Sequence, residues 1–211
     1  IMAVGRGERL RPLTDNLPKP MLKVGEKPIL EHNIDRLSRY GVSNFHISLG
    51  YLGDKISSHF GNGESKELNI NYITEDMPLG TIGAAGKIKD FKNDTVLIMN
   101  SDLLTNIDYG EFYNYFEESL ADMAVATVPY HVNVPYAVMD IDHENVVSGF
   151  KEKPVFTYYS NAGIYLIKKE LFKFIPSGNR FDATDLMDLL MKEGFKIISF
   201  PIHAYWLDIG R

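Results

Sequence analysis

The pattern of apolar and polar positions alternates between short apolar runs and longer segments with helical spacing. Short runs rich in β-branched residues predict strands, whereas apolar residues three and four positions apart predict helices. We expect strands at 1–4, 44–50, 69–74, 95–100, 160–168 and 196–202, and helices at 28–41, 53–61, 109–119 and 181–194. Strands that alternate with helices are typical of a mostly parallel sheet. The pattern therefore predicts an α/β fold.

The predicted helices carry start and stop signals. Pro28 occupies a first turn and Gly41 follows the last turn of the same helix, while Asp182 is placed to cap the helix of 181–194. The positions expected to face the core are Leu30, Ile34 and Leu37, then Phe112 and Phe116, then Ala183, Leu186, Met187, Leu190 and Met191.

From residue 121 onward the pattern changes to strands with little helix. The runs 122–130, 136–142 and 145–154 are strand-like and close together in sequence. They predict a small antiparallel β insertion, and we expect residues 121–165 to form one wall of a pocket.

Composition narrows the class of protein. The 211 residues are 45% hydrophobic, which is enough for one sizeable core and predicts a single domain spanning 1–211. A net charge of −6 argues against binding a nucleic acid polymer. The chain has no cysteine, signal peptide or membrane-length apolar run, so a cytoplasmic protein is the simplest expectation. Because it begins without Met inside a strand-like run, we expect a fragment of a longer protein.

The opening stretch, IMAVGRGERLRPLTDNLPKPMLKVGEKP, has the features of an anion-binding loop. Gly5 and Gly7 let backbone N–H groups turn toward a ligand. The nearby cations are Arg6, Arg9, Arg11 and Lys19. Neither the dinucleotide-binding fingerprint nor the Walker A motif fits this spacing. An ordinary surface loop with solvated arginines is the alternative.

Two later segments are also candidates for a site. Pro78 and Gly80 predict a tight loop in which the backbone approaches its neighbours closely, and Thr81 is placed to cap a helix of small residues. Asp102 follows the apolar run 95–100, at the strand end where α/β sheets bind ligands, and a carboxylate there can hold a divalent cation. The alternative is a turn aspartate that accepts from its own backbone.

The opening stretch resembles the signature loop of the sugar-1-phosphate nucleotidylyltransferases, a glycine pair, then Gly-Thr-Arg-Leu-x-Pro-Leu-Thr and Pro-Lys-Pro. Further matches follow in the order of the family motifs: Leu79–Ala84, Asp102, Tyr136–Val138, Glu152–Pro154, Asn161–Tyr165 and Trp206–Gly210. The sequence departs from those motifs at Val4, Glu8, Ile82, Ser101 and Ala137.

The resemblance implies a Rossmann-like three-layer sandwich and a set of functional residues. Arg9 and Lys19 would hold the triphosphate and the reacting phosphates, and Asp102 and Asp208 would bind Mg²⁺. The nucleotide-binding residues implied are Ala3, Gly5, Gly7, Glu75, Pro78, Gly80 and Thr81. The sugar-phosphate-binding residues implied are Tyr136, Glu152, Lys153, Asn161 and Gly163.

The implied reaction joins a nucleoside monophosphate from a nucleoside triphosphate to a sugar-1-phosphate and releases pyrophosphate. The segments PKPM and GEKPILEHNI are most similar to the mannose-1-phosphate guanylyltransferase-like branch, which implies GTP and mannose-1-phosphate or a related hexose-1-phosphate. Uridylyl, thymidylyl and cytidylyl transfer are alternatives. A catalytically silent domain that binds nucleotide sugars is another, and only the departures from the motifs favour it. A homo-oligomer is compatible with the sequence.

Overall fold

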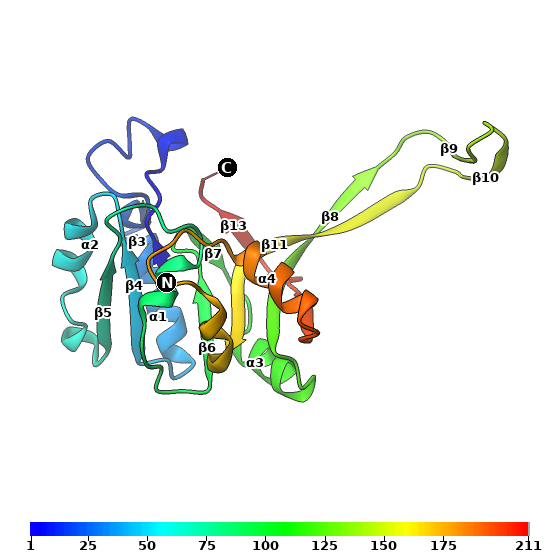
Figure 1. Ribbon diagram of the computed structural model, residues 1–211. Helices are drawn as coiled ribbons and strands as arrows, with labels where there is room; N and C mark the ends of the chain where they lie inside the picture. Colours follow the sequence, from blue (N-terminus) through cyan, green and yellow to red (C-terminus); the bar gives the residue numbers. More distant parts are fainter. Residues whose placement is uncertain (211) are drawn as a thin grey trace.

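The computed structural model describes residues 1–210, and Arg211, which directly follows the predicted motif, lies outside the described residues. Two groups of strands form the centre of the molecule (Figure 1). The first group is parallel in the order β1-β4-β5, formed by β1 (Met2–Ala3), β4 (Asn44–Leu49) and β5 (Asn69–Thr74). The second has the order β12-β8-β11-β6, formed by β6 (Thr95–Met99), β8 (Met123–Asn133), β11 (Val155–Lys168) and β12 (Ile197–Pro201).

A parallel bridge between Met2 and Asn100 joins these two groups into one sheet. In the joined sheet β11 is antiparallel to both of its neighbours, β6 and β8, while β12 is parallel to β8. The other described strands of this sheet therefore share one direction, which confirms the predicted mostly parallel mixed sheet. Their carboxyl ends meet at one edge, and the segments that follow β1, β5 and β6 all begin there.

Alternate residues of the strands face two apolar layers, which makes the fold a three-layer sandwich. One layer contains α1 (Ile29–Arg39), α2 (Gly53–Phe60) and α3 (Tyr109–Glu118). The other contains the 3₁₀ helices η4 (Gly83–Lys87) and η5 (Lys169–Phe174) together with α4 (Ala183–Lys192). In β11, for example, Ile164 and Leu166 pack in the first layer and Tyr165 and Ile167 in the second. This is the period of two expected for a strand.

The helix predictions hold with two corrections. Met191, expected in the core, is 55% exposed because it lies at the last turn of α4 on its solvent side. Thr81 does not cap a helix of small residues, since η4 begins after Ile82 and no side chain caps it. The hydroxyl of Thr81 instead accepts from the N–H of Ala183 at 2.8 Å, at the start of α4. Asp182 caps α4 as predicted.

Short elements complete the carboxyl edge of the sheet. The opening segment forms η1 (Glu8–Leu10), η2 (Lys19–Met21), β2 (Lys23–Val24) and β3 (Lys27–Pro28). The remaining short helix, η3 (Glu64–Lys66), precedes β5 and lies at the amino end of that strand instead. Near the end of the chain β13 (Trp206–Asp208) pairs antiparallel with β7 (Leu103–Thr105), and Asp208 lies opposite Leu103. This pairing brings Asp208 beside Asp102, more than a hundred residues away in sequence.

The predicted antiparallel insertion is a long arm, defined here as residues 128–160. The ladder between β8 and β11 continues out to the pair Asn133 and Val155, so both strands leave the sheet together. Beyond them β9 (Val138–Ile141) and β10 (Val147–Lys151) form a hairpin. In Figure 1 this hairpin projects far from the body of the molecule. The ladder thus carries the distal arm away from the sheet edge in this structure, and the pocket wall expected of residues 121–165 stays a prediction.

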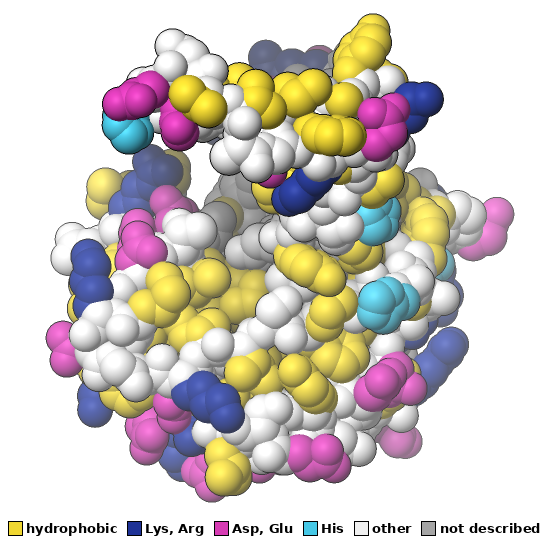
Figure 2. All heavy atoms as spheres, turned by 90° about the vertical axis from the view of Figure 1, so that its right-hand side faces the viewer, with side chains coloured by type: hydrophobic (Ala, Val, Ile, Leu, Met, Phe, Trp, Pro, Cys, Tyr) yellow, Lys and Arg dark blue, Asp and Glu magenta, His cyan; other side chains and the backbone are white. Residues whose placement is uncertain are grey.

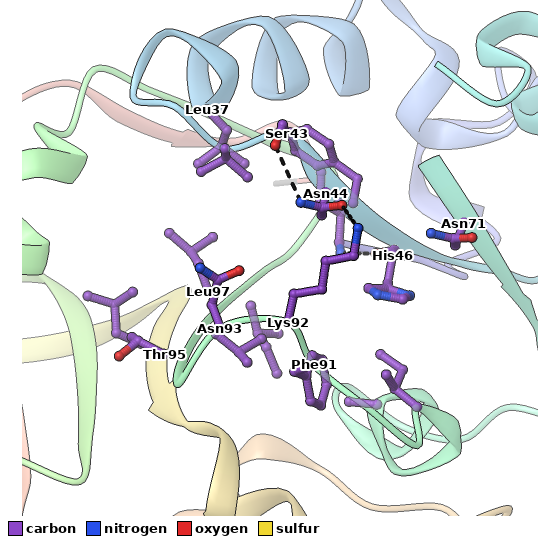
Figure 3. Close-up of a pocket in the computed structure, with 18 of the residues that line it drawn as sticks. Leu37, Ser43, Asn44, His46, Asn71, Phe91, Lys92, Asn93, Thr95 and Leu97 are labelled. Carbon is purple, nitrogen blue, oxygen red and sulfur yellow. Dashed lines mark hydrogen bonds between the residues drawn. The ribbon is translucent and has the colours of Figure 1, made fainter. Parts of the chain in front are cut away.

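A cavity of about 940 Å³ lies at the opposite edge, around the amino ends of β4, β5 and β6 (Figure 3). Some of its polar side chains bond to one another. Asn44 Oδ1 accepts from Lys92 Nζ at 3.0 Å, and Asn44 Nδ2 donates to Ser43 Oγ at 3.3 Å. It contains none of the predicted site residues. Among residues 1–210 no helix is long and apolar enough to cross a membrane.

Candidate active site at the carboxyl edge

The opening loop leaves β1 at the carboxyl edge and is held in shape by its own contacts. Gly7 has φ +62°, a conformation that favours glycine, and a Cβ there would lie 2.9 Å from Thr14 Cγ2. The buried Thr14 donates its hydroxyl to the carbonyl of Gly7 at 2.8 Å. A Cβ on Gly5, by contrast, would meet no atom within 4 Å. The loop is thus fixed at Gly7 and open to a ligand at Gly5.

Lys19 is the centre of the charged cluster. Its Nζ bonds to Asp102 Oδ2 and lies 3.4 Å from Asp208 Oδ1. The side chain of Lys19 is 12% exposed, and those of the two aspartates are 23% and 26% exposed, so the cluster is largely removed from water. Three residues from distant parts of the chain therefore place one ammonium between two carboxylates.

The backbone fixes both aspartates. The N–H of Ile209 donates to the carbonyl of Asp102 at 3.1 Å, and the N–H of Gly210 donates to Asp208 Oδ1 at 2.7 Å. Arg9 reaches the same place, since its Nη1 donates to the carbonyl of Gly210 at 3.5 Å. The structure therefore brings together Arg9, Lys19, Asp102 and Asp208, the four residues predicted to be catalytic.

Two residues that the sequence reasoning missed support this cluster. The buried Asn33 of α1 donates Nδ2 to the carbonyl of Ser101 at 3.3 Å, directly before Asp102. The sequence could have indicated this role, because Asn33 is a polar residue on the otherwise apolar face of the helix. Trp206 donates Nε1 to the carbonyl of Ala162 at 3.0 Å and anchors β13 to the sheet. Its place in the family motif did not indicate this contact.

Gly163 belongs to the same support, although the resemblance implied a sugar-phosphate contact. It has φ +73°, and a Cβ there would lie 2.6 Å from Asn100 Nδ2. Its carbonyl accepts from the N–H of Asn100 at 2.9 Å, and its N–H donates to Asn161 Oδ1 at 2.9 Å. Gly163 is buried and Asn161 is exposed. The glycine thus lets β11 approach the turn that carries Asp102.

The predicted nucleotide-binding residues lie along the same edge. Ala3 is 1% exposed and ends β1, and Glu75 follows β5. Glu75 Oε2 accepts from the N–H of Leu79 at 2.8 Å, and the Ser48 side chain also interacts with this carboxyl. Burial raises the pKa of the Glu75 carboxyl, and the bond from Leu79 opposes that rise. The Glu75 carboxylate is thus tied to the segment that leads from β5 to η4.

The segment after Glu75 is tied to α4. Gly80 has φ +79°, and a Cβ there would lie 2.7 Å from Asp182 Oδ1. The N–H of Thr81 donates to the same oxygen at 2.8 Å. Pro78 is exposed. These contacts hold the loop that follows Glu75 close to the start of α4.

The remaining predicted residues lie apart from the cluster. Tyr136, Glu152 and Lys153 are all exposed and belong to the arm. Val4, which departs from the family motif, is half-buried. A Cβ placed on Gly50 would lie 3.2 Å from the Cβ of Val4. The described structure therefore unites the predicted phosphate-handling residues but not the arm residues predicted to bind the sugar phosphate.

The fold and the charged cluster define a class of α/β protein that gathers cations and carboxylates at the carboxyl edge of its sheet. The chain belongs to the nucleotidyl transferase family, whose model matches residues 1–211. This result confirms the resemblance seen in the motifs.

Curated relatives cover the whole chain at moderate identity. It is 31% identical over 218 residues to "Mannose-1-phosphate guanylyltransferase" of Mycobacterium tuberculosis, 29% identical over 230 residues to "UTP--glucose-1-phosphate uridylyltransferase" of Synechocystis sp., and 33% identical over 219 residues to "Bifunctional protein GlmU" of Methanocaldococcus jannaschii. The chain spans 60%, 59% and 50% of those proteins, respectively.

Solved structures share the fold over nearly all of the chain. HddC from Yersinia pseudotuberculosis superposes with a TM-score of 0.74 at 29% identity, covering 99% of this chain and 92% of that one. A putative glucose-1-phosphate thymidylyltransferase from Bacillus anthracis gives a TM-score of 0.76 at 25% identity, covering 99% and 88%. HddC has also been solved complexed with GMP-PN.

Proposed function

We propose that this chain transfers a nucleoside monophosphate from a nucleoside triphosphate to a sugar-1-phosphate, with release of pyrophosphate. The observation that carries the proposal is the ammonium of Lys19 between the carboxylates of Asp102 and Asp208, beside an open glycine loop. Family membership supports the same reaction class. The charges needed for phosphate transfer therefore lie together at one sheet edge.

The reaction requires no catalytic base on the protein. The nucleophile is an oxygen of the sugar-1-phosphate, which is largely ionised at pH 7 because its second pKa is about 6. This oxygen forms a bond to the α-phosphorus, and the bond from that phosphorus to the bridging oxygen of the β-phosphate breaks. Pyrophosphate leaves with the electron pair. The barrier is mainly electrostatic, so positioning and charge neutralisation by the protein should dominate.

The residues of the cluster have distinct roles in this proposal. Arg9 binds the β- and γ-phosphates with its planar guanidinium, and Lys19 lies beside the α-phosphate as a point charge. The loop around Gly5 offers backbone N–H groups to the phosphates. Glu75 and the segment of Pro78, Gly80 and Thr81 contact the base and ribose.

The carboxylates of Asp102 and Asp208 suit Mg²⁺. They converge on one cation already, the Lys19 ammonium, and hard oxygen ligands are those that Mg²⁺ prefers. Asp102 and Asp208 would hold the ion, which when bound supplies charge neutralisation of the phosphates. The Lys19 ammonium would then contribute its positive charge to the substrate phosphates.

For the substrates we propose GTP and mannose-1-phosphate or a related hexose-1-phosphate. The support is the relative named mannose-1-phosphate guanylyltransferase, together with the HddC structure complexed with GMP-PN. Relatives named for uridylyl and thymidylyl transfer have similar identity, so UTP and dTTP are the competing donors. We expect the arm residues Tyr136, Glu152 and Lys153 to contact the sugar phosphate when it binds.

Pyrophosphate release measured over a grid of nucleoside triphosphates and sugar-1-phosphates tests the proposal. We expect the highest kcat/KM for GTP with mannose-1-phosphate, and a loss of release in the Lys19→Ala variant under the same conditions. Release that is strongest with another pair would overturn the substrate assignment alone. Folded protein that binds nucleotide but releases no pyrophosphate from any pair would instead show a silent binding domain.

A further inference from the structure

The segment that follows β4 lies directly beside the opening loop, defined here as residues 4–18. β1 and β4 are parallel neighbours with Ala3 paired to Leu49, so their carboxyl ends leave the sheet side by side. Gly50 allows a close approach, because a Cβ there would lie 3.0 Å from the carbonyl oxygen of Val4. The next residue, Tyr51, is half-buried and belongs to none of the matched motifs. Its aromatic ring therefore lies at the carboxyl edge, next to the loop proposed to bind phosphates.

Tyr51 contacts the opening loop near both of its ends. The guanidinium carbon of Arg6 lies over the Tyr51 ring, 5.9 Å from the ring centroid. A cation within about 6 Å of an aromatic face is attracted by the ring electrons. The Tyr51 hydroxyl donates to the carbonyl of Asp15 at 2.8 Å. Lys55, in the first turn of α2, donates Nζ to the neighbouring carbonyl of Asn16 at 2.6 Å. The segment after β4 thus holds the start and the end of the loop.

The three arginines of the loop differ in what their guanidinium groups contact. Arg11 Nε lies 3.4 Å from Asp15 Oδ1, so the charge of Arg11 is paired. Arg9 Nη1 donates to the carbonyl of Gly210 at 3.5 Å. Arg6 is exposed and held by the ring, and it has no ion pair in the described part of the chain. Because contact with the face of a ring uses none of the N–H groups, the donors of Arg6 stay available to an anion.

Arg6 is also close to the charged cluster along the backbone. A Cβ on Gly7 would lie 3.1 Å from Lys19 Cβ, so the residue after Arg6 packs against Lys19. The residue before Arg6 is Gly5, the open position of the loop. The carboxyl edge is at the top of Figure 1, and Figure 2 shows a hollow at this height below the arm, with Lys and Arg side chains beside it. A polyanion that lies along the loop from Gly5 to Lys19 therefore comes within reach of Arg6.

We propose that Arg6 is a further triphosphate-binding residue and that Tyr51 is the positioning residue that holds it. A long cationic side chain loses rotamer freedom when it binds a ligand, and this loss weakens binding. A ring that holds the guanidinium beforehand reduces the loss, and the hydroxyl bond to Asp15 limits movement of the loop. The inference rests on the triphosphate-binding part of the proposed function and not on transfer to a sugar.

The dissociation constant of GTP, measured by calorimetric titration with Mg²⁺ and without sugar-1-phosphate, tests the role of Arg6. No transfer can occur without the acceptor, so binding is measured apart from turnover. We expect Arg6→Gln to raise the Kd for GTP about 10-fold, as for the loss of one charge-assisted hydrogen bond. The increase should be smaller for GMP, which carries only the α-phosphate. Arg11→Gln removes a loop arginine whose charge is already paired, and as the matched control it should change the Kd for GTP less than about twofold.

A double-mutant cycle tests whether Tyr51 acts through Arg6. In a Tyr51→Leu background the additional loss caused by Arg6→Gln should shrink from about 10-fold to about 3-fold, because the ring no longer holds the guanidinium. Tyr51→Phe keeps the ring, so Arg6→Gln should retain its full effect in that background. Lys55→Ala removes another contact to the loop without touching Arg6, and its effect should add to that of Arg6→Gln.

Each outcome bears on a different part of the inference, once melting temperatures show that the variants are folded. An unchanged Kd for GTP in Arg6→Gln, or equal losses in Arg6→Gln and Arg11→Gln, would overturn the assignment of Arg6. Strict additivity of Arg6→Gln with Tyr51→Leu would overturn the positioning role of Tyr51. A parent protein that binds none of GTP, UTP and dTTP would overturn this inference together with the proposed function. GTP binding without pyrophosphate release from any sugar-1-phosphate would overturn the transfer reaction and leave the role of Arg6 standing.

Discussion

The carboxyl edge of the sheet and the arm differ in how firmly they hold their functional residues. At the edge, Lys19, Asp102 and Asp208 are mostly buried and tied to one another and to the backbone of Gly210. On the arm, Tyr136 and Lys153 are exposed. The groups that would stabilise the transferred phosphate are therefore preorganised by the fold, whereas the groups expected to hold the acceptor sugar depend on where the arm lies. Substitutions in the two regions should consequently have different kinetic signatures.

The largest effect is expected from Asp102→Asn. The change is nearly isosteric and keeps the backbone contacts, but it removes one of the two charges proposed to hold Mg²⁺. We expect kcat to fall on the order of 100-fold or more, as for other losses of a strong electrostatic contact in the transition state. Asp188→Asn, at an exposed carboxylate of α4 that belongs to no predicted site, serves as the control. Turnover by Asp102→Asn within a few-fold of the parent at saturating Mg²⁺ would remove this aspartate from the mechanism.

Lys19→Ala should also lower kcat, by a factor on the order of 10 to 100. If Lys19 meets charge that develops at the α-phosphorus, its loss affects the transition state more than the bound triphosphate. We therefore expect a smaller change in the KM for the nucleoside triphosphate than in kcat. Steady-state kinetics at fixed sugar-1-phosphate measure both. A raised KM with an unchanged kcat would limit Lys19 to substrate binding.

The arm gives the contrasting prediction. Lys153→Ala should raise the KM for the sugar-1-phosphate about 10-fold and leave the KM for the triphosphate unchanged, because a charge-assisted hydrogen bond contributes roughly 1.5–3 kcal/mol. Lys151→Ala is the matched control, since Lys151 is also exposed but belongs to β10 and to no predicted site. Equal kinetic effects of the two substitutions would indicate a general charge effect and not a sugar-phosphate contact at Lys153.

The sequence predicted the carboxyl edge better than the arm for a physical reason. Asp102 follows an apolar strand, and parallel strands deliver their carboxyl ends to one edge, so its place followed from local pattern. The meeting of Asp208 with Asp102 depends on the β13 and β7 pairing, a long-range contact that no local pattern encodes. The direction of the arm was likewise not predictable, because alternation specifies strands but not whether a ribbon bends over the sheet. Thr81 was assigned to the wrong helix because its partner, Ala183, is distant in sequence.

Two glycines, one at the edge and one on the arm, allow the stability of the two regions to be compared. At the edge, Gly163→Ala forces a side chain into a left-handed conformation with its Cβ 2.6 Å from Asn100 Nδ2. On the arm, a Cβ at Gly149 would meet only Asp140 Oδ2, at 3.3 Å. We expect Gly163→Ala to reduce the free energy of unfolding by about 1–3 kcal/mol and Gly149→Ala to change it little. Urea denaturation of both variants measures the difference, and equal losses would mean that the edge is no more tightly packed than the arm.

The smallest effect is expected at Glu75, where the prediction concerns pH. Burial raises the pKa of this carboxyl in the folded protein above its value of about 4.3 in an unfolded chain. The folded state then binds the proton more tightly, so stability falls as the pH rises from the unfolded pKa through the folded pKa. Glu75→Gln keeps an oxygen to accept from the N–H of Leu79 and removes the charge. Its melting temperature should therefore exceed that of the parent at pH 8, and the difference should vanish near pH 4. A difference of the same size at both pH values would show that ionisation of the Glu75 carboxyl does not cost stability.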